Sequence, residues 1–237
     1  MLSFPRTRTS VVLLTVLAAA GILAAGCGDD TPSRAATKPP AKTPTTPTIP
    51  TNDPDLIAQL ADDQGTKLRD AGCSIGSFDE EEAVHVTDAD QLGWKTNPPT
   101  SGTHFPDWAP FGRYDEELDP GYVVHNLEHG GVAVWYGPDV DAKTLDAIDD
   151  LLDDEEKWIV SPRANVDGIT SAAWTKLLTC PQTALAKLTP KGTAAGLDAW
   201  YDAVVSTGSA SEKDLPAYAG SMKDPVPTRD ISAESPF

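Results

Sequence analysis

The stretch GVAVWY, residues 131–136, predicts a buried β-strand, because a short apolar run with β-branched and aromatic residues suits a strand covered on both faces. After this stretch, apolar residues recur at the spacing of one helix face: Leu145, Ile148, Leu151 and Leu152. Further strands are predicted at residues 158–160 and 169–178. Two more apolar stripes predict a first helix that ends before Gly72 and a last helix: Leu56, Ile57, Leu60 and Leu68, then Leu197, Trp200 and Val204.

The order of these elements indicates the fold class. From residue 131 onward it is strand, helix, strand, strand, helix, which predicts an α+β domain with a mostly antiparallel sheet and helices on one face. Residues 97–121 are dense in proline and glycine and predict a long loop region. No internal repeat interrupts the chain, so one globular domain is expected.

The first 26 residues have the features of a bacterial lipoprotein signal peptide. Arg6 and Arg8 precede an apolar run at residues 11–25, which is shorter than the roughly 20 residues of a membrane-spanning helix. Small residues and then Cys27 follow, as expected where the peptidase cleaves and the cysteine is acylated. Ala24 stands where the lipoprotein consensus usually has leucine. An ordinary secretory signal with an unmodified Cys27 is the alternative.

The next segment, residues 27–54, is rich in proline and threonine and nearly free of large apolar side chains. Such a composition favours an extended, disordered linker, because it cannot bury a core. The predicted organisation is therefore a signal peptide at 1–26, a lipidated cysteine and linker at 27–54, one extracytoplasmic domain at 55–224, and a loose tail at 225–237.

The charge of the chain limits its partners. The formal net charge is −18, and loss of the signal peptide removes two arginines and no acid, which leaves −20. Such a surface, without a cluster of basic residues, excludes nucleic acid as a partner. We therefore expect attachment to the outer face of the bacterial cytoplasmic membrane through the lipid on Cys27. The sequence identifies no protein partner.

Two cysteines remain in the predicted domain. Outside the cytoplasm Cys73 and Cys180 are expected to form a disulfide. Two separate buried thiols are the alternative. A redox-active pair is disfavoured because the Cys-x-x-Cys spacing is missing.

All four histidines lie between residues 85 and 129. His125 and His129 are four residues apart, which places them on one face of a helical turn or of a strand. His104 ends the proline-stiffened stretch NPPTSGTH, residues 97–104. The sequence predicts that these three imidazoles bind copper or zinc, since imidazole nitrogen is a common ligand of both. Glu128, as a fourth ligand or an orienting partner, and His85 are weaker candidates.

Two other interpretations stay open for these histidines. They could hydrogen-bond to the backbone in a loop-rich core without any metal. The stretch HNLEH, residues 125–129, also matches the H-x-x-E-H signature of a metallohydrolase group, in which the glutamate is the general base. That signature needs a stable helix, and Gly130 and Gly131 are expected to end any helix directly after His129. No catalytic residue is assigned, and a binding protein is favoured over an enzyme.

The stretches NPPTSGTH and HNLEHG together resemble a bacterial domain-of-unknown-function family with Pro-Pro-Thr-Ser-Gly-x-His and His-x-Leu-Glu-His-Gly motifs. The resemblance extends over residues 71–136 and weakens toward the C-terminus. It implies a secreted or membrane-anchored protein and places the four histidines and Glu128 on motif positions, but it implies no reaction. Thr103 replaces a common proline, which predicts a slightly looser loop beneath His104.

The sequence therefore predicts a membrane-anchored lipoprotein with a histidine-based site for copper or zinc. A metal-free interaction domain of the cell envelope is the second hypothesis, and a metallohydrolase is the third.

Overall fold

The structure is a computed structural model that describes residues 43–152, 157–205 and 207–209. Within these ranges the helices are α1 (Pro54–Gln59), α2 (Gln64–Ala71), α3 (Pro120–Glu128), α4 (Ala142–Asp149), α5 (Gln182–Leu185) and α6 (Pro190–Val204). The strands are β1 (Ser74–Ser77), β2 (Gly112–Arg113), β3 (Val132–Tyr136), β4 (Trp158–Pro162), β5 (Ile169–Ala173) and β6 (Lys176–Cys180).

The strands form one sheet in the order β1-β6-β5-β3-β4-β2. The pairs β1–β6, β6–β5 and β5–β3 are antiparallel, whereas β3–β4 and β4–β2 are parallel. The expected α+β class with a mostly antiparallel sheet is confirmed. The parallel part follows from the β3–α4–β4 connection, because a crossover through a helix returns the chain in the same direction.

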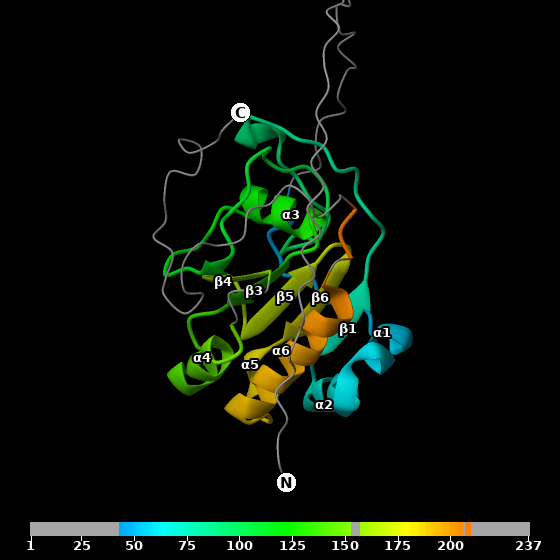
Figure 1. The fold of residues 1–237 in the computed structure, drawn as a ribbon, viewed down its shortest axis with the longest axis vertical. Helices are drawn as coiled ribbons and strands as arrows, with labels where there is room; N and C mark the ends of the chain where they lie inside the picture. Colours follow the sequence, from blue (N-terminus) through cyan, green and yellow to red (C-terminus); the bar gives the residue numbers. More distant parts are fainter. Residues whose placement is uncertain (1–42, 153–156, 206, 210–237) are drawn as a thin grey trace, which may run out of the picture. The chain divides into compact units, whose positions relative to one another are not determined.

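A layer of helices covers the sheet (Figure 1), in which α6 lies against both α2 and α4. On α6, Trp200 and Val204 are completely buried, as the predicted apolar stripe requires. The Trp158 ring of β4 stacks on the Tyr201 ring with centroids 4.4 Å apart. The GVAVWY strand is β3, and Val134 and Trp135 in it are also completely buried.

Two predicted elements are each divided in the structure. The expected first helix is α1 and α2, separated by a short 3-10 turn (Ala61–Asp63) in which Asp62 and Asp63 have φ angles of 52° and 57°. The expected strand at 169–178 is the hairpin of β5 and β6, and Thr175 in its turn has φ 63°. Both predictions were wrong because left-handed turn residues leave the apolar periodicity intact.

The cysteine prediction is confirmed by a disulfide between Cys73 and Cys180, which are 107 residues apart in sequence. Cys73 precedes β1 and Cys180 ends β6, next to the pair Ser74 and Thr179 in the antiparallel register. The disulfide therefore joins the edge strand of the sheet to its neighbour.

Part of the predicted linker contacts the domain. Thr48 donates its N–H to the Asn97 carbonyl at 2.7 Å, and Asn52 Oδ1 accepts from the Ile75 N–H at 2.9 Å. Asp53 then caps α1 through the N–H groups of Asp55 and Leu56. Residues 48–53 thus fix the start of α1 against the edge strand β1.

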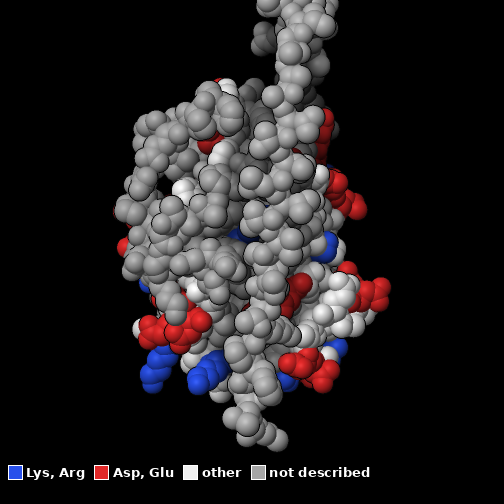
Figure 2. All heavy atoms as spheres, viewed as in Figure 1, with Lys and Arg blue, Asp and Glu red and all other residues white. Residues whose placement is uncertain are grey.

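The predicted signal peptide, Cys27 and the predicted tail at 225–237 lie outside the described residues. Among the helices that are described, none has both the length and the apolar character needed to cross a membrane. Acidic side chains gather in several groups on the face shown in Figure 2, in keeping with the net charge of −18.

Candidate metal centre

A backbone bridge brings His85 and His104 together. The two residues form an isolated parallel β-bridge, in which the Val86 N–H donates to the His104 carbonyl at 2.8 Å and the His104 N–H donates to the Val84 carbonyl at 3.0 Å. Because both peptide groups of the bridge are paired, the spacing between the two Cα atoms is fixed. His85, the weaker candidate in sequence, is therefore adjacent to His104.

The loop before His104 is tied down by side chains. The Thr103 hydroxyl accepts from the Gly93 N–H at 3.0 Å and donates to the Gly93 carbonyl at 3.2 Å. Trp94 Nε1 donates to the Thr103 carbonyl at 2.8 Å. The expectation that Thr103 would loosen this loop was wrong, because its hydroxyl makes two hydrogen bonds that a proline could not make.

The helix α3 positions His125, Glu128 and His129. Asp119 caps its N-terminus by accepting from the Gly121 N–H at 2.8 Å, and Pro120 is its first residue. The helix ends at Glu128, and the His129 N–H still bonds to the His125 carbonyl at 3.2 Å. The expected end of any helix directly after His129 is confirmed, since α3 stops at Glu128 and His129 is its C-cap.

Helix α3 was missed because its buried side chains do not form a narrow stripe. Val123, Val124 and Leu127 are all completely buried, together with the polar Asn126. Asn126 exchanges two hydrogen bonds with the Ala109 backbone. The sequence did contain a start signal, since Asp119-Pro120 has an N-cap residue followed by proline at the first helical position.

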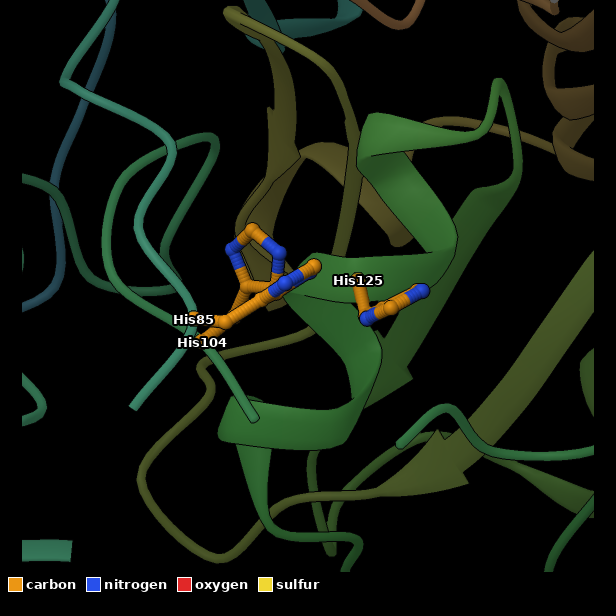
Figure 3. A group of neighbouring side chains, drawn as sticks. All are labelled: His85, His104 and His125. Carbon is orange, nitrogen blue, oxygen red and sulfur yellow. The ribbon is translucent and has the colours of Figure 1, made fainter. Parts of the chain in front are cut away.

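Three imidazoles converge beside α3 (Figure 3). The ring centroids of His85, His104 and His125 lie 4.7, 5.1 and 5.2 Å apart, and one ligand nitrogen from each ring lies within 4.8 Å of the other two. We call these three residues the histidine cluster. The sequence placed two of its members, His104 and His125, among the ligands and gave His85 less weight.

His129 lies next to the histidine cluster. Its ring stacks on His125 with centroids 4.9 Å apart and planes at 8°. Its carbonyl accepts from Lys157 Nζ at 3.2 Å. The predicted role of His129 as a ligand stays a prediction.

Backbone carbonyls determine which nitrogen of the two buried rings faces the cluster. His104 Nδ1 lies 2.8 Å from the Gly102 carbonyl oxygen, and His125 Nδ1 lies 2.9 Å from the Phe105 carbonyl oxygen. Since a carbonyl oxygen only accepts, both Nδ1 atoms must have the proton. The Nε2 atom of each ring is then the one available for a ligand.

His104 Nε2 is the exceptional atom of the site. It is buried and makes no hydrogen bond within the described part of the chain, although Glu128 Oε2 lies 3.2 Å away. A nitrogen lone pair facing a carboxylate would be repelled, and an unsatisfied buried polar atom is costly. A positive charge between the two atoms removes both penalties. That charge is either a proton on His104 or a metal ion.

The Glu128 carboxylate lies within 4.0 Å of three ring nitrogens. Besides His104, its Oε2 lies 4.0 Å from Nε2 of His85 and 4.0 Å from Nε2 of His129. The adjacent His104 side chain lowers the pKa of Glu128 below its ordinary value. The carboxylate therefore stays ionised and is the negative group of the site.

The pKa values of His85 and His125 favour the neutral form of these two imidazoles. Burial lowers the pKa of His125 from 6.5 to about 4. Burial, followed by the nearby His104, also lowers the pKa of His85. Since only neutral imidazole binds a metal, these two residues are ready to be ligands at neutral pH.

The distances can be compared with a tetrahedral zinc site. Ligand atoms of one zinc lie about 3.3 Å apart, because each bond is about 2.0–2.1 Å long. The 3.2 Å between His104 Nε2 and Glu128 Oε2 matches this value. The separations of 4.0 Å to His85 and up to 4.8 Å within the cluster require inward movements of roughly an ångström. The His85 and His125 ring planes lie at 7° to each other, so their lone pairs do not point at one place. The donor set thus fits a transition metal after this contraction and a rotation of the His85 ring.

Comparison with known families covers this same region. A family model described as a protein of unknown function (DUF3105) matches residues 85–189. The matched segment is therefore similar to that family. It begins at His85 and includes every histidine, Glu128 and Cys180, whereas Cys73 lies before it. The DUF3105 match reaches further toward the C-terminus than the expected resemblance, which weakened after residue 136. No curated protein and no solved structure matches the chain.

Proposed function

We propose that the DUF3105 segment of this chain binds one divalent transition-metal ion, copper or zinc. His85, His104 and His125 are the nitrogen ligands, and Glu128 supplies an oxygen ligand. The observation on which the proposal rests is His104 Nε2, which is completely buried, lacks a hydrogen bond in the described ranges, and faces a carboxylate. A bound cation satisfies the nitrogen and the carboxylate together.

The donor atoms favour a divalent ion over cuprous copper. The cluster offers imidazole nitrogen and carboxylate oxygen, which suit Cu²⁺ and Zn²⁺, whereas Cu⁺ prefers thiolate and thioether sulfur. Both cysteines in the described residues are bonded to each other and are unable to act as thiolate ligands. Copper is the stronger competitor of the two divalent ions, following the Irving–Williams order.

The cellular setting is part of the proposal. Cleavage after residue 26 and acylation of Cys27 would hold the domain at the outer face of the bacterial cytoplasmic membrane. The N-terminal sequence supports this placement, and so does the disulfide, since disulfides persist mainly outside the reducing cytoplasm.

The test is metal titration of the purified, chelator-treated full-length protein by isothermal titration calorimetry, with elemental analysis of the loaded protein. We expect one Cu²⁺ or Zn²⁺ per chain. His104→Asn should abolish binding and keep the fold, because the asparagine amide can replace Nδ1 as donor to the Gly102 carbonyl but has no counterpart of Nε2.

The matched variant is His104→Gln, whose longer side chain reaches toward the former position of Nε2 and should keep weak binding. Circular dichroism of both variants checks that the fold is intact. A wild-type protein that takes up neither ion would contradict the proposal and leave a proton as the charge between His104 and Glu128.

A further inference from the structure

The three nitrogen ligands differ sharply in exposure. His104 is 0 % exposed and His125 is 4 % exposed, whereas the His85 side chain is 54 % exposed. An ion at the cluster is therefore covered by protein on the side of His104 and His125. His85 is the ligand through which an ion meets solvent.

The ligands also differ in how firmly their rings are held. His104 and His125 are each fixed through Nδ1 to a backbone carbonyl. The His85 ring has no hydrogen bond within the described ranges; it touches the rings of His104 and His125 and lies 4.0 Å from the Glu128 carboxylate. The bridge to His104 holds the His85 backbone. The ring alone can turn away while the other ligands stay in place.

The chain around His85 is strongly acidic. Residues 79–90 contain six acids and no lysine or arginine: Asp79, Glu80, Glu81, Glu82, Asp88 and Asp90. Glu80 accepts from Trp174 Nε1, and Glu81 accepts from the Lys95 N–H. Glu82, Asp88 and Asp90 are exposed on either side of His85. A negative surface at the open side of the site attracts cations and basic molecules.

We propose that the ion enters and leaves through His85 by ligand exchange with a basic, metal-binding peptide segment of another molecule. This inference rests on the proposed function. A nitrogen donor of the incoming segment bonds to the ion while His104 and His125 still hold it. The bond from His85 to the ion then breaks, and the electron pair of that bond returns to the imidazole. The exchange involves no change in oxidation state, and the acids beside His85 orient the basic partner.

The experiment measures transfer of Cu²⁺ from the loaded full-length protein to two tripeptides, Gly-His-Lys and Gly-His-Glu, by stopped flow. Trp108 lies 5.6 Å from the His125 ring, so its fluorescence should recover as the ion leaves. We expect a rate that rises in proportion to peptide concentration. At low salt the lysine peptide should be roughly tenfold faster, and the difference should shrink at high salt. A rate independent of peptide concentration, or equal rates at low salt, would overturn the inference.

Two sets of variants separate the steps. His85→Ala should still bind Cu²⁺, more weakly and with faster loss, whereas His125→Asn should not bind. Replacing Glu82, Asp88 and Asp90 by their amides should abolish the preference for the lysine peptide, while the protein still binds one Cu²⁺ per chain because all its ligands remain. If His85→Ala loses Cu²⁺ binding as completely as His125→Asn does, the exchange role of His85 is refuted.

Failure of the two proposals is distinguishable. If the wild-type protein binds no Cu²⁺ in the titration, the proposed function fails. If it binds Cu²⁺ but the rate of transfer does not depend on peptide concentration or peptide charge, only the exchange route through His85 fails.

Discussion

Acidification of the metal-free protein should weaken the fold, and His125 should account for much of the loss. Burial lowers the pKa of His125 from 6.5 to about 4. At pH values between about 4 and 6.5, His125 is mostly protonated in the unfolded chain and mostly neutral in the folded protein. Stability must therefore fall as the pH is lowered from about 6.5 toward 4, because protons are bound preferentially by the unfolded state.

The size of this effect follows from the two pKa values. With 6.5 in the unfolded chain and about 4 in the folded protein, lowering the pH from 7 to 5 costs about 2 kcal/mol of unfolding free energy. The pKa of Glu128 is lowered from 4.5, so its stabilising contribution is lost only at still lower pH. The pKa of the exposed His85 is also lowered, but solvent screening makes its contribution smaller.

The assay is urea unfolding of chelator-treated protein at pH 7 and pH 5, compared between wild type and His125→Asn. Asparagine can keep a donor for the Phe105 carbonyl but has no group that titrates in this range. The variant should lose about 2 kcal/mol less than wild type between the two pH values. Equal losses in the two proteins would refute the assignment of this pH dependence to His125.

Three further predictions concern other parts of the chain. Replacing Cys73 and Cys180 by serine should lower the unfolding free energy by up to about 4–5 kcal/mol in urea denaturation, because the disulfide closes a loop of 107 residues; an unchanged midpoint would contradict this. Globomycin should cause an uncleaved precursor to accumulate, and Cys27→Ser should abolish lipid labelling; normal processing of the serine variant would argue against acylation. Thr103→Val should cost about 1–3 kcal/mol, because the Gly93 N–H loses its acceptor; a stability equal to wild type would show that water replaces the hydroxyl.

Several features of the fold could be predicted because they depend on local composition. The strand at Val132–Tyr136 and the face of α6 follow from apolar periodicity. The pairing of Cys73 with Cys180 follows from their being the two cysteines left once Cys27 is assigned to lipid. These inferences need only residue types and spacing.

The rest depends on contacts between distant segments. The bridge between His85 and His104 pairs two irregular stretches 19 residues apart, and no periodicity marks either stretch. The parallel arrangement of β2, β4 and β3 likewise joins residues 112–113 to residues 159–160. The sequence thus placed the candidate ligands in one region, but which of their rings lie together required the three-dimensional arrangement.

The sequence left two interpretations of the histidines open, backbone hydrogen bonding and metal binding. In the structure the two are compatible, because Nδ1 of a ring can bond to the backbone while Nε2 of the same ring stays available for a metal. Hydrogen bonds from Nδ1 of His104 and His125 to carbonyl oxygens fix the rings and leave Nε2 of each ring for a ligand, and His104 Nε2 lies 3.2 Å from Glu128 Oε2. The same arrangement orients the ligands in many metal sites, where the second ring nitrogen donates to a neighbouring group. Backbone bonding therefore does not count against a metal here. A metal site and a metal-free domain differ in the cation between His104 Nε2 and Glu128 Oε2, which is a metal ion in the first case and a proton in the second. His104→Asn removes the nitrogen that either cation would need.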